Sequence, residues 1–385
     1  MVTEAAPATL AEARDAVLGG GALLFAGAGT KLDWLPPARA CDTIVRTAGL
    51  RRLVAHERDD LTATVEAGMP LAELQRELAG AGQWLAVDPP LAQAGATVGG
   101  VFAADDAGPR RLRYGTLRDQ VIGCTVVLSD GAVARSGGRV IKNVAGYDLM
   151  RPLCGSHGTL GLVTELTVRL HPLPERAVTL RAAAGAHAAA GLALRLLGGV
   201  AQPSAVDWTD DTVWVLLEGR GAGLMQRAES VRRAGAALGV HLEELDDAEA
   251  EASWAVLREL PAGRPGETVL RAATLPDGFG DLAIVFERAA QRSGLQVALH
   301  SHVALGLHTA RLSGGTAAAH TGLAGVWREA VAGLGGTPWL RRRVGGVALP
   351  ASDTPAAAGL MRRLKHALDP DGRCGPGRLD WLEAA

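Results

Sequence analysis

The stretch VIKNVAGYDLMRPLCGSHGTLGLVTELTV, residues 140–168, decides our prediction of the fold. Its second half is a glycine-rich loop, Gly155 to Gly161, that leads directly into Val163 to Leu170. Polar and apolar residues alternate along that run, and alternation with a period of two predicts a half-buried β-strand. Because glycine has no side chain, the three glycines of the loop allow backbone to lie close against a neighbour. The stretch therefore predicts a loop–strand junction with accessible backbone.

A second glycine-rich loop follows a short apolar run near the N-terminus. Ala22–Ala26 is predicted to be a buried strand, and it leads into Gly27-Ala28-Gly29-Thr30-Lys31. A strand that ends in Gly-x-Gly can present successive backbone N–H groups to a phosphate. The loop lacks the third glycine of the dinucleotide fingerprint and the Gly-Lys-Ser/Thr of the Walker pattern. Taken alone, it could equally be an ordinary turn.

A third loop of the same kind is Gly95-Ala96-Thr97-Val98-Gly99-Gly100. Each of the three loops enters or leaves a predicted strand between residues 20 and 170. One such loop is weak evidence for a ligand. Three of them indicate an extended ligand that contains a diphosphate.

Length and composition predict a soluble globular protein of two domains. The chain has 385 residues, which is long for a single hydrophobic core. Hydrophobic residues make up 48% and charged residues 21% of it, as in ordinary globular proteins. The formal net charge of -2 gives no electrostatic reason to expect nucleic acid or an anionic membrane as a partner.

The cysteines and the hydropathy exclude several other classes of protein. Without a Cys-x-x-Cys pair, we expect neither an iron–sulfur cluster nor a structural zinc site from this chain alone, and no disulfide framework; the cysteines are Cys41, Cys124, Cys154 and Cys374. We find no signal peptide and no apolar run of the roughly 18 residues that a membrane span needs. We therefore expect a cytoplasmic protein without direct membrane insertion.

These motifs together resemble a known family of flavoproteins. The set is similar to the family of vanillyl-alcohol oxidase and p-cresol methylhydroxylase, in its FAD-linked oxidase branch. The run Lys142–Leu149 resembles the signature of the FAD-binding E subunits of bacterial glycolate oxidases. The other segments that carry the resemblance are 27–31, 96–100, 113–119, 158–161 and the closing segment 368–379.

The resemblance implies a cofactor and the residues that hold it. The cofactor is FAD, bound non-covalently, because loop 27–31 lacks the histidine that tethers flavin in many members. The expected FAD contacts are Gly27, Ala28, Gly29, Thr30, Lys31, Pro89, Ala96, Thr97, Gly99, Gly100, Asp105, Tyr114, Gly158, Gly161 and Val163. Two positions depart from the family pattern, since Asp105 and Gly375 each stand where relatives carry asparagine.

We therefore expect an α+β protein with a two-subdomain FAD-binding domain of the p-cresol methylhydroxylase type and a ferredoxin-like α+β cap. His171-Pro172-Leu173-Pro174 is the predicted boundary, so the domains are 1–174, 175–348 and a C-terminal segment, 349–385, that packs back on the FAD domain. Strands and helices after residue 175 follow the βαββαβ order of a ferredoxin-like unit. We find no internal repeat.

Catalytic residues are not identified by the sequence. Oxidation of a 2-hydroxy acid needs an arginine for the carboxylate and a base, typically histidine, for the hydroxyl proton. His300, His302 and His308 are the nearest candidates, but the family's histidine-acid metal motif is absent. We expect partly exposed strand histidines there and no metal, and a structural role for His157. The Gly-x-Ser-x-Gly pattern of serine hydrolases is also absent, because Cys154 occupies its first position.

The resemblance implies an FAD subunit of a glycolate oxidase complex that acts on a small 2-hydroxy acid. The implied partners are a catalytic FAD subunit and an iron–sulfur subunit that passes electrons on, which could place the complex at the inner membrane. Two alternatives remain open: a self-sufficient FAD-dependent 2-hydroxy-acid dehydrogenase, and a non-catalytic scaffold whose flavin site is vestigial.

Overall fold

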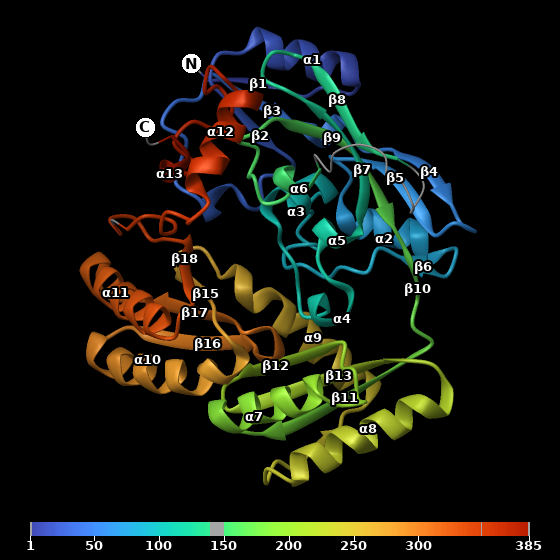
Figure 1. The fold of residues 1–385 in the computed structure, drawn as a ribbon, viewed down its shortest axis with the longest axis vertical. Helices are drawn as coiled ribbons and strands as arrows, with labels where there is room; N and C mark the ends of the chain where they lie inside the picture. The colour runs from blue at the N-terminus through green and yellow to red at the C-terminus, as the bar shows by residue number, and fades with distance from the viewer. Residues whose placement is uncertain (1, 139–149, 348, 384–385) are drawn as a thin grey trace. The chain divides into compact units, whose positions relative to one another are not determined.

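The computed structural model describes residues 2–138, 150–347 and 349–383 (Figure 1). The chain divides into two compact units. The first unit comprises Met1–Ala107, Gly115–Leu173 and Thr354–Ala385, and the second comprises Gly108–Tyr114 and Pro174–Asp353. No helix among the described residues is both long and apolar enough to cross a membrane.

A small parallel sheet of the first unit presents the glycine-rich loop 27–31. Its strand order is β1–β3–β2, with β1 at Thr3–Ala5, β2 at Leu23–Ala26 and β3 at Thr43–Arg46. Helix α1, Leu10–Gly19, is capped by Thr9, whose side chain accepts the N–H of Glu12, and buries Ala13 and Val17. Because β2 ends at Ala26, the loop that begins at Gly27 leaves the sheet at its carboxyl edge.

The larger sheet of the first unit carries loop 155–161, which leads into its strand β9. Its five strands are antiparallel, in the order β4–β5–β9–β7–β8: β4 Leu53–Glu57, β5 Thr62–Glu66, β9 Leu162–Arg169, β7 Val121–Val127 and β8 Val133–Gly137. Strands β7 and β8 pair as an antiparallel hairpin. The expectation that β9 is half-buried is wrong, because it lies between β5 and β7 and only Glu165 and Arg169 are partly exposed.

Short helices and a two-stranded sheet complete the first unit. Its main apolar core includes Leu71, Leu74 and Leu78 on one face of α2 and Val98, Val101 and Phe102 of α3. The remaining elements are α2 Leu71–Ala79, α3 Val98–Ala104, α5 Leu117–Gln120, α6 Met150–Leu153, β6 Gln83–Trp84 with β10 His171–Pro172, α12 Ala358–Leu368 and α13 Asp380–Glu383.

The first half of the second unit has the predicted ferredoxin-like topology. Its strands lie in the order β14–β11–β13–β12, and helices α7 and α8 follow the first and third of them in sequence. The bounds are β11 Arg176–Ala183, α7 Ala186–Leu197, β12 Ala205–Thr209, β13 Thr212–Gly219, α8 Gly221–Ala236 and β14 Glu243–Glu244. Helices α4, Arg111–Tyr114, and α9, Asp247–Glu259, also belong to this unit.

The second half of this unit repeats the same topology, which the sequence did not predict. Its strand order, β16–β17–β15–β18, is the mirror of the first half's order in one continuous eight-stranded sheet. Strands β12 and β16 join the halves, each being the second strand of its own half. The bounds are β15 Thr268–Ala273, α10 Phe279–Ser293, β16 Gln296–His302, β17 Leu307–Ser313, α11 Ala317–Gly333 and β18 Thr337–Arg342.

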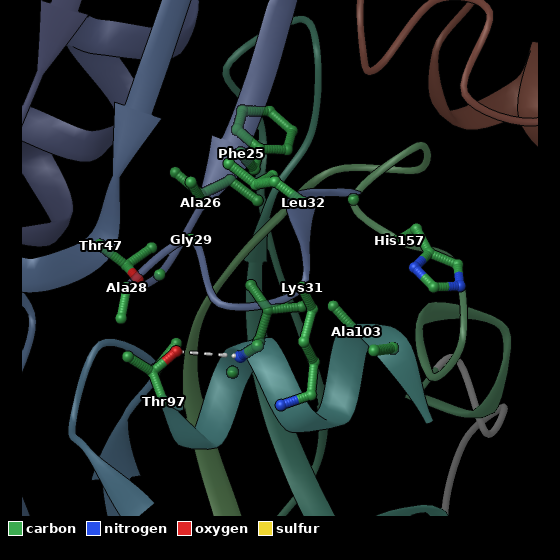
Figure 2. A pocket seen from close by; sticks show the side chains of 18 of the residues that line it. Phe25, Ala26, Ala28, Gly29, Lys31, Leu32, Thr47, Thr97, Ala103 and His157 are labelled. Carbon is green, nitrogen blue, oxygen red and sulfur yellow. Dashed lines mark hydrogen bonds between the residues drawn. The ribbon is translucent and has the colours of Figure 1, made fainter. Parts of the chain in front are cut away.

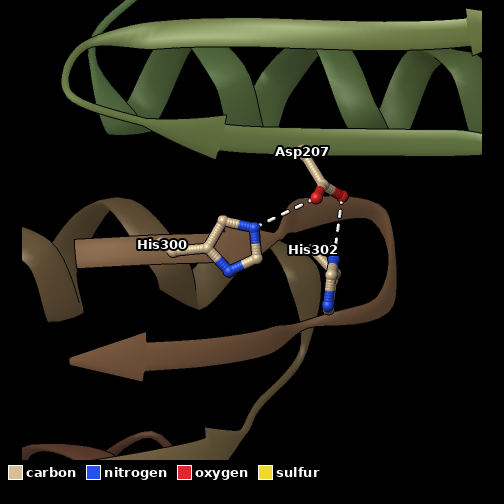
Figure 3. Close-up of side chains that lie close together, drawn as sticks. All are labelled: Asp207, His300 and His302. Atoms are coloured by element: carbon tan, nitrogen blue, oxygen red, sulfur yellow. Dashed lines mark hydrogen bonds and ion pairs between the residues drawn. The ribbon is translucent and has the colours of Figure 1, made fainter. Parts of the chain in front are cut away.

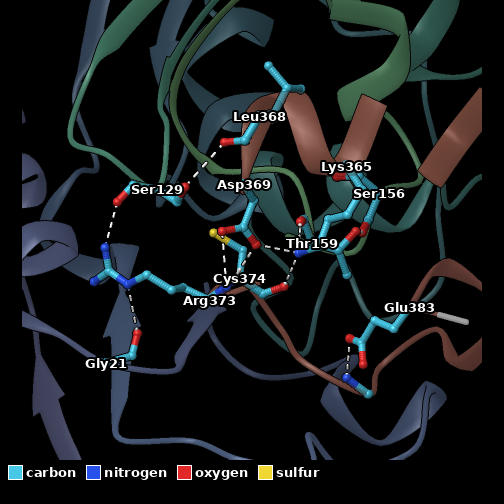
Figure 4. A network of polar contacts seen from close by, with 11 residues as sticks. Gly21, Ser129, Ser156, Thr159, Lys365, Leu368, Asp369, Arg373, Cys374 and Glu383 are labelled. Carbon is cyan, nitrogen blue, oxygen red and sulfur yellow. Dashed lines mark hydrogen bonds and ion pairs between the residues drawn. The ribbon is translucent and has the colours of Figure 1, made fainter. Parts of the chain in front are cut away.

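The C-terminal segment is fixed to the first unit by buried polar contacts (Figure 4). Lys365 Nζ donates to the carbonyl oxygens of Thr159 at 2.8 Å and Cys374 at 2.9 Å, and it pairs with Asp369. Both charged side chains are buried, at 5% and 1% exposure. The guanidinium of Arg373 donates to the carbonyls of Gly21, Ser129, Val17 and Gly20. These contacts tie residues 365–374 to loop 155–161 and to the turn before β2.

We predict that Lys365→Met destabilises the first unit by about 3–5 kcal/mol, because it leaves the buried Asp369 carboxylate without its cation. Urea unfolding monitored by circular dichroism measures the change. Arg363→Met, an exposed position on the same helix, is the matched control and should change the free energy of unfolding by less than about 0.5 kcal/mol. Equal stabilities of the Lys365 and Arg363 variants would contradict the assignment of this contact.

Candidate cofactor site

The three glycine-rich loops of the sequence line one cavity in the first unit (Figure 2). Its empty volume, which includes solvent space at the mouth, is about 760 Å³. Loop 27–31 forms one side, residues of α3 form the floor, and loop 156–163 forms a further side.

Loop 27–31 presents unpaired backbone donors. The N–H groups of Ala28, Gly29 and Thr30 donate no hydrogen bond to any residue that the structure describes. Gly29 has a φ of +79°, which favours glycine and turns the chain between its neighbours. Successive free N–H groups in such a turn form a concave site for an anion. The loop therefore suits a phosphate better than a neutral group.

Loop 27–31 can pack against the start of helix α3 because glycine at positions 27 and 99 leaves room for close contact. A Cβ on Gly27 would lie 2.1 Å from Thr97 Oγ1, and a Cβ on Gly99 would lie 2.6 Å from the Cβ of Ala67. Thr97 also caps α3, since its hydroxyl accepts the N–H of Gly100 at 3.1 Å (Figure 2). Glycine is therefore required at 27 and 99 for the loop, the helix and strand β5 to pack together.

Loop 155–161 has left-handed backbone beside the cavity. His157, Gly158 and Gly161 have φ values of +52°, +76° and +153°. His157 is held in this conformation by its N–H, which donates to the carbonyl of Ala103 at 2.8 Å. A left-handed histidine at a cavity wall is the kind of strain that functional sites retain. The prediction that His157 is structural agrees with this bond, but its side chain also lines the cavity.

Lys31 brings a positive charge to the same cavity. Its side chain is 8% exposed, and its Nζ lies 3.6 Å from Oδ2 of Asp106, which is 1% exposed. The ammonium also lies 3.4 Å from the Pro90 carbonyl and 5.2 Å from the centre of the Trp34 ring. Because Asp106 balances the lysine within the protein, the pair can persist in a buried place.

Most of the residues expected at FAD line this cavity. They are Gly27, Ala28, Gly29, Thr30, Lys31, Thr97, Gly99, Gly100, Gly158, Gly161 and Val163. The other lining residues include Phe25, Leu32, Thr47, Ala67, Ala103, Ala104, Ser156, Leu162 and Arg378. Arg378 belongs to the closing segment 368–379, for which the resemblance gave this arginine no role.

Four expected contacts lie outside the lining of the cavity: Pro89, Ala96, Asp105 and Tyr114. Tyr114 belongs to the second unit, where burial raises its pKa. Asp105 ends α3 in a left-handed conformation, φ +44°, and accepts a hydrogen bond from the thiol of Cys154 at 3.4 Å. The run Lys142–Leu149, with Tyr147 and Asp148, lies outside the described residues.

The candidate histidines of the cap lie at the seam between the two halves of the second unit (Figure 3). Asp207 on β12 accepts hydrogen bonds from His300 Nε2 at 3.0 Å and His302 Nδ1 at 2.8 Å on β16. Both histidines are 2% exposed, so the expectation of partly exposed strand histidines is wrong. The reason is topological, because β16 lies inside an eight-stranded sheet rather than at its edge.

This cluster has the ligand types of a metal site but also the contacts of a buried hydrogen-bond network. Asp207, His300 and His302 have ligand atoms within 4.8 Å of one another. Both carboxylate oxygens already accept a hydrogen bond from a ring nitrogen. His308 is outside the cluster, since its nitrogens contact Ser301 Oγ and Thr274 Oγ1, both at 2.8 Å, and its ring stacks on Phe279.

The protonation states follow from burial. Burial lowers the pKa of His300 to about 4, although its hydrogen bond to Asp207 acts the other way, and lowers the pKa of His308 to about 3. Burial alone would raise the pKa of Asp207, but the charge on His302 and the two hydrogen bonds outweigh it and lower that pKa to about 2. At neutral pH, Asp207 is ionised while His300 and His308 are neutral.

We predict that the second unit loses stability as pH falls below about 6.5, the pKa of an unfolded histidine. Between that pH and the depressed folded values of 4 and 3, the unfolded chain binds protons that the folded chain excludes. Each histidine then contributes a slope of up to roughly 1.4 kcal/mol per pH unit. Urea unfolding at pH 7, 6 and 5, monitored by tryptophan fluorescence, measures this slope.

His308→Gln tests the assignment, because glutamine can keep polar contacts with Ser301 and Thr274 but does not titrate. In this variant, the slope of unfolding free energy against pH should fall by up to roughly 1.4 kcal/mol per pH unit, the contribution of one proton. His187→Gln, at an exposed histidine of the same unit, should leave the slope unchanged. An unchanged slope in the His308 variant would contradict the account.

Comparison with known proteins places the chain in a family. The family model described as "FAD binding domain" matches residues 3–137, and the model described as "FAD linked oxidases, C-terminal domain" matches residues 174–379. The second model covers more than half of the chain.

Curated relatives match mainly over part of their length. Glycolate oxidase subunit GlcE of Escherichia coli is 36% identical over 184 residues, which is 47% of this chain and 51% of GlcE. Glycolate oxidase subunit GlcD of Bacillus subtilis is 41% identical over 133 residues, 34% of this chain and 28% of GlcD. A mitochondrial D-lactate dehydrogenase of Arabidopsis thaliana is 40% identical over 129 residues, 34% of this chain and 22% of the relative.

A solved structure has the same fold over nearly the whole chain. It is an alkyldihydroxyacetonephosphate synthase, with a TM-score of 0.74 and 16% identity, over 98% of this chain and 77% of the synthase. Together with the two matching family models, this similarity confirms the predicted fold class. The chain belongs to the FAD-linked oxidases, a family of FAD-dependent oxidoreductases.

Proposed function

We propose that FAD binds non-covalently in the cavity formed by the three glycine-rich loops. The observation that carries the proposal is the row of unpaired N–H groups at Ala28, Gly29 and Thr30, which faces the same cavity as Lys31. A diphosphate supplies the acceptors that such donors need. In this proposal loop 27–31 and the residues at 97–100 hold the cofactor, and Gly158, Gly161 and Val163 lie along its other side.

The bound flavin supplies the redox chemistry. This chain's residues orient the cofactor and exclude water from it. Loop 155–161 keeps backbone rather than side chains against the cavity at Gly158 and Gly161, and the buried pair of Lys31 and Asp106 adds a fixed dipole. Asp105, Ala96, Pro89 and Tyr114 remain predicted contacts of the cofactor.

We further propose that the chain is an FAD subunit of a glycolate oxidase complex that acts on a 2-hydroxy acid. The support is the similarity to GlcE, over about half of that relative, and to GlcD. The complex would include a catalytic FAD subunit and an iron–sulfur subunit that accepts the electrons. Such a complex could lie at the inner membrane through its partners.

The buried cap histidines favour this assignment over a self-sufficient dehydrogenase. A base for the hydroxyl proton must reach the substrate. His300, His302 and His308 are each 2% exposed or less and are held by Asp207, Ser301 and Thr274. We therefore assign the oxidation of the acid to a partner subunit.

The first test is the visible absorption spectrum of the purified chain before and after acid precipitation. We expect flavin bands that move into the supernatant, as dissociable FAD requires. A colourless protein that takes up no added FAD would contradict the proposal and support the scaffold with a vestigial site. Flavin that stays with the pellet would contradict non-covalent binding.

Gly99→Ala tests the position of the cofactor. The added Cβ would lie 2.6 Å from Ala67 Cβ and 2.8 Å from its carbonyl oxygen, which displaces the cavity floor. We expect FAD affinity to fall at least about tenfold. Gly49→Ala is the control, because its Cβ would lie 2.5 Å from the Pro7 carbonyl, away from the cavity lining. Equal FAD affinities in both variants would contradict this site.

Anaerobic addition of glycolate separates the subunit from the self-sufficient enzyme. We expect the flavin of the isolated chain to remain oxidised, and an artificial electron acceptor to show no turnover. Rapid bleaching of the isolated chain by glycolate or D-lactate would instead establish an independent dehydrogenase.

A further inference from the structure

Arg378 is a buried cation that has no ion-pair partner among the described residues. Its side chain is 4% exposed and lines the cavity of the three glycine-rich loops. Within the described part of the chain it forms no ion pair. Its Nε is buried and has no hydrogen-bond partner there. A buried charge of this kind is costly unless an anion approaches it.

The guanidinium is held in a fixed position by backbone. Its Nη1 donates to the carbonyl oxygens of Leu32 at 2.7 Å, Pro36 at 2.9 Å and Leu35 at 3.5 Å. These carbonyls belong to the segment that directly follows loop 27–31. One edge of the guanidinium thus anchors the C-terminal segment to that loop, while Nε remains for another acceptor.

The charges that line the cavity also favour binding of an anion. Burial lowers the pKa of Arg378, although the nearby Asp33 carboxylate acts the other way; the group stays protonated at neutral pH. Lys31 is already balanced by Asp106. The free N–H groups of residues 28–30 and the guanidinium therefore add positive potential to one cavity.

We propose that Arg378 binds a phosphate group of the pocket's occupant, so that the C-terminal segment completes the diphosphate site of FAD. The proposal rests on the proposed function, which places FAD in this cavity. It adds a side chain from the C-terminal segment to the residues that contact the cofactor. The planar guanidinium suits a phosphate oxygen, and its fixed orientation lowers the entropic cost of binding.

The test is titration of apoprotein with FAD, followed by quenching of flavin fluorescence, at 50 and 300 mM NaCl. Arg378→Met should weaken FAD binding about 10- to 100-fold at low salt, as expected for loss of a charge-assisted contact. It should also flatten the dependence of affinity on salt. Arg378→Lys, which keeps the charge, should bind FAD more tightly than Arg378→Met.

Arg373→Met is the matched control. Arg373 also donates to several backbone carbonyls and anchors the same segment, but it does not line the cavity. We expect its FAD affinity to stay within about threefold of the wild type and its salt dependence to be unchanged. An equal loss in the Arg373 and Arg378 variants would show that anchoring, not phosphate contact, matters, and would overturn the proposal.

The remaining outcomes are also decisive. Arg378→Met that binds FAD like the wild type overturns the proposal. A weaker affinity with unchanged salt dependence overturns it as well. If Arg378→Met does not fold, Arg378→Gln, which keeps amide donors for the carbonyls, takes its place with the same expected loss. Failure of wild-type apoprotein to bind FAD would refute the proposed function itself.

Discussion

The first unit depends on close approach between backbones at its glycines. Gly27 meets Thr97 and Gly99 meets Ala67 at distances that leave no room for a Cβ. Because of these two contacts, loop 27–31 rests on α3, and α3 rests on strand β5. The cavity lies between this loop, helix α3 and residues 156–163. Its walls are largely backbone, so its chemistry is that of N–H and C=O groups supplemented by a few charged side chains.

Those charges are supplied from distant parts of the chain and are compensated differently. Lys31 is paired with Asp106, and Lys365 is paired with Asp369. Arg373 is satisfied by carbonyls. Arg378 alone among these four cations both lines the cavity and forms no ion pair with a described residue. In our proposal, a phosphate of the bound cofactor compensates the charge of Arg378. Binding of the cofactor would then depend on the position of the C-terminal segment.

The loops were predictable because glycine patterns are local. Gly-x-Gly after an apolar run and repeated glycines before β9 both mark positions where backbone must come close, and eleven of the fifteen expected contacts line the cavity. The closing segment 368–379 was recognised from the sequence, but the role of Arg378 was not predictable, since it depends on a fold that brings residues 32–36 beside residue 378. The ferredoxin-like order of the first half of the cap could be predicted from the succession of strand and helix patterns after residue 175. The second half was missed because β17, which contains His308, Thr309 and Arg311, does not read as a strand. With that strand missing, the burial of His300 and His302 at the seam was also missed.

Hydrogen–deuterium exchange of the whole chain, with and without FAD, tests the central claim most directly, because it locates the cofactor without any substitution. The account predicts slower exchange on FAD binding in peptides that contain Ala28–Thr30, whose N–H groups have no partner among the described residues, and in peptides that span 156–163. It predicts no change at the seam of β12 and β16. Protection at the seam with none at residues 28–30 would contradict it.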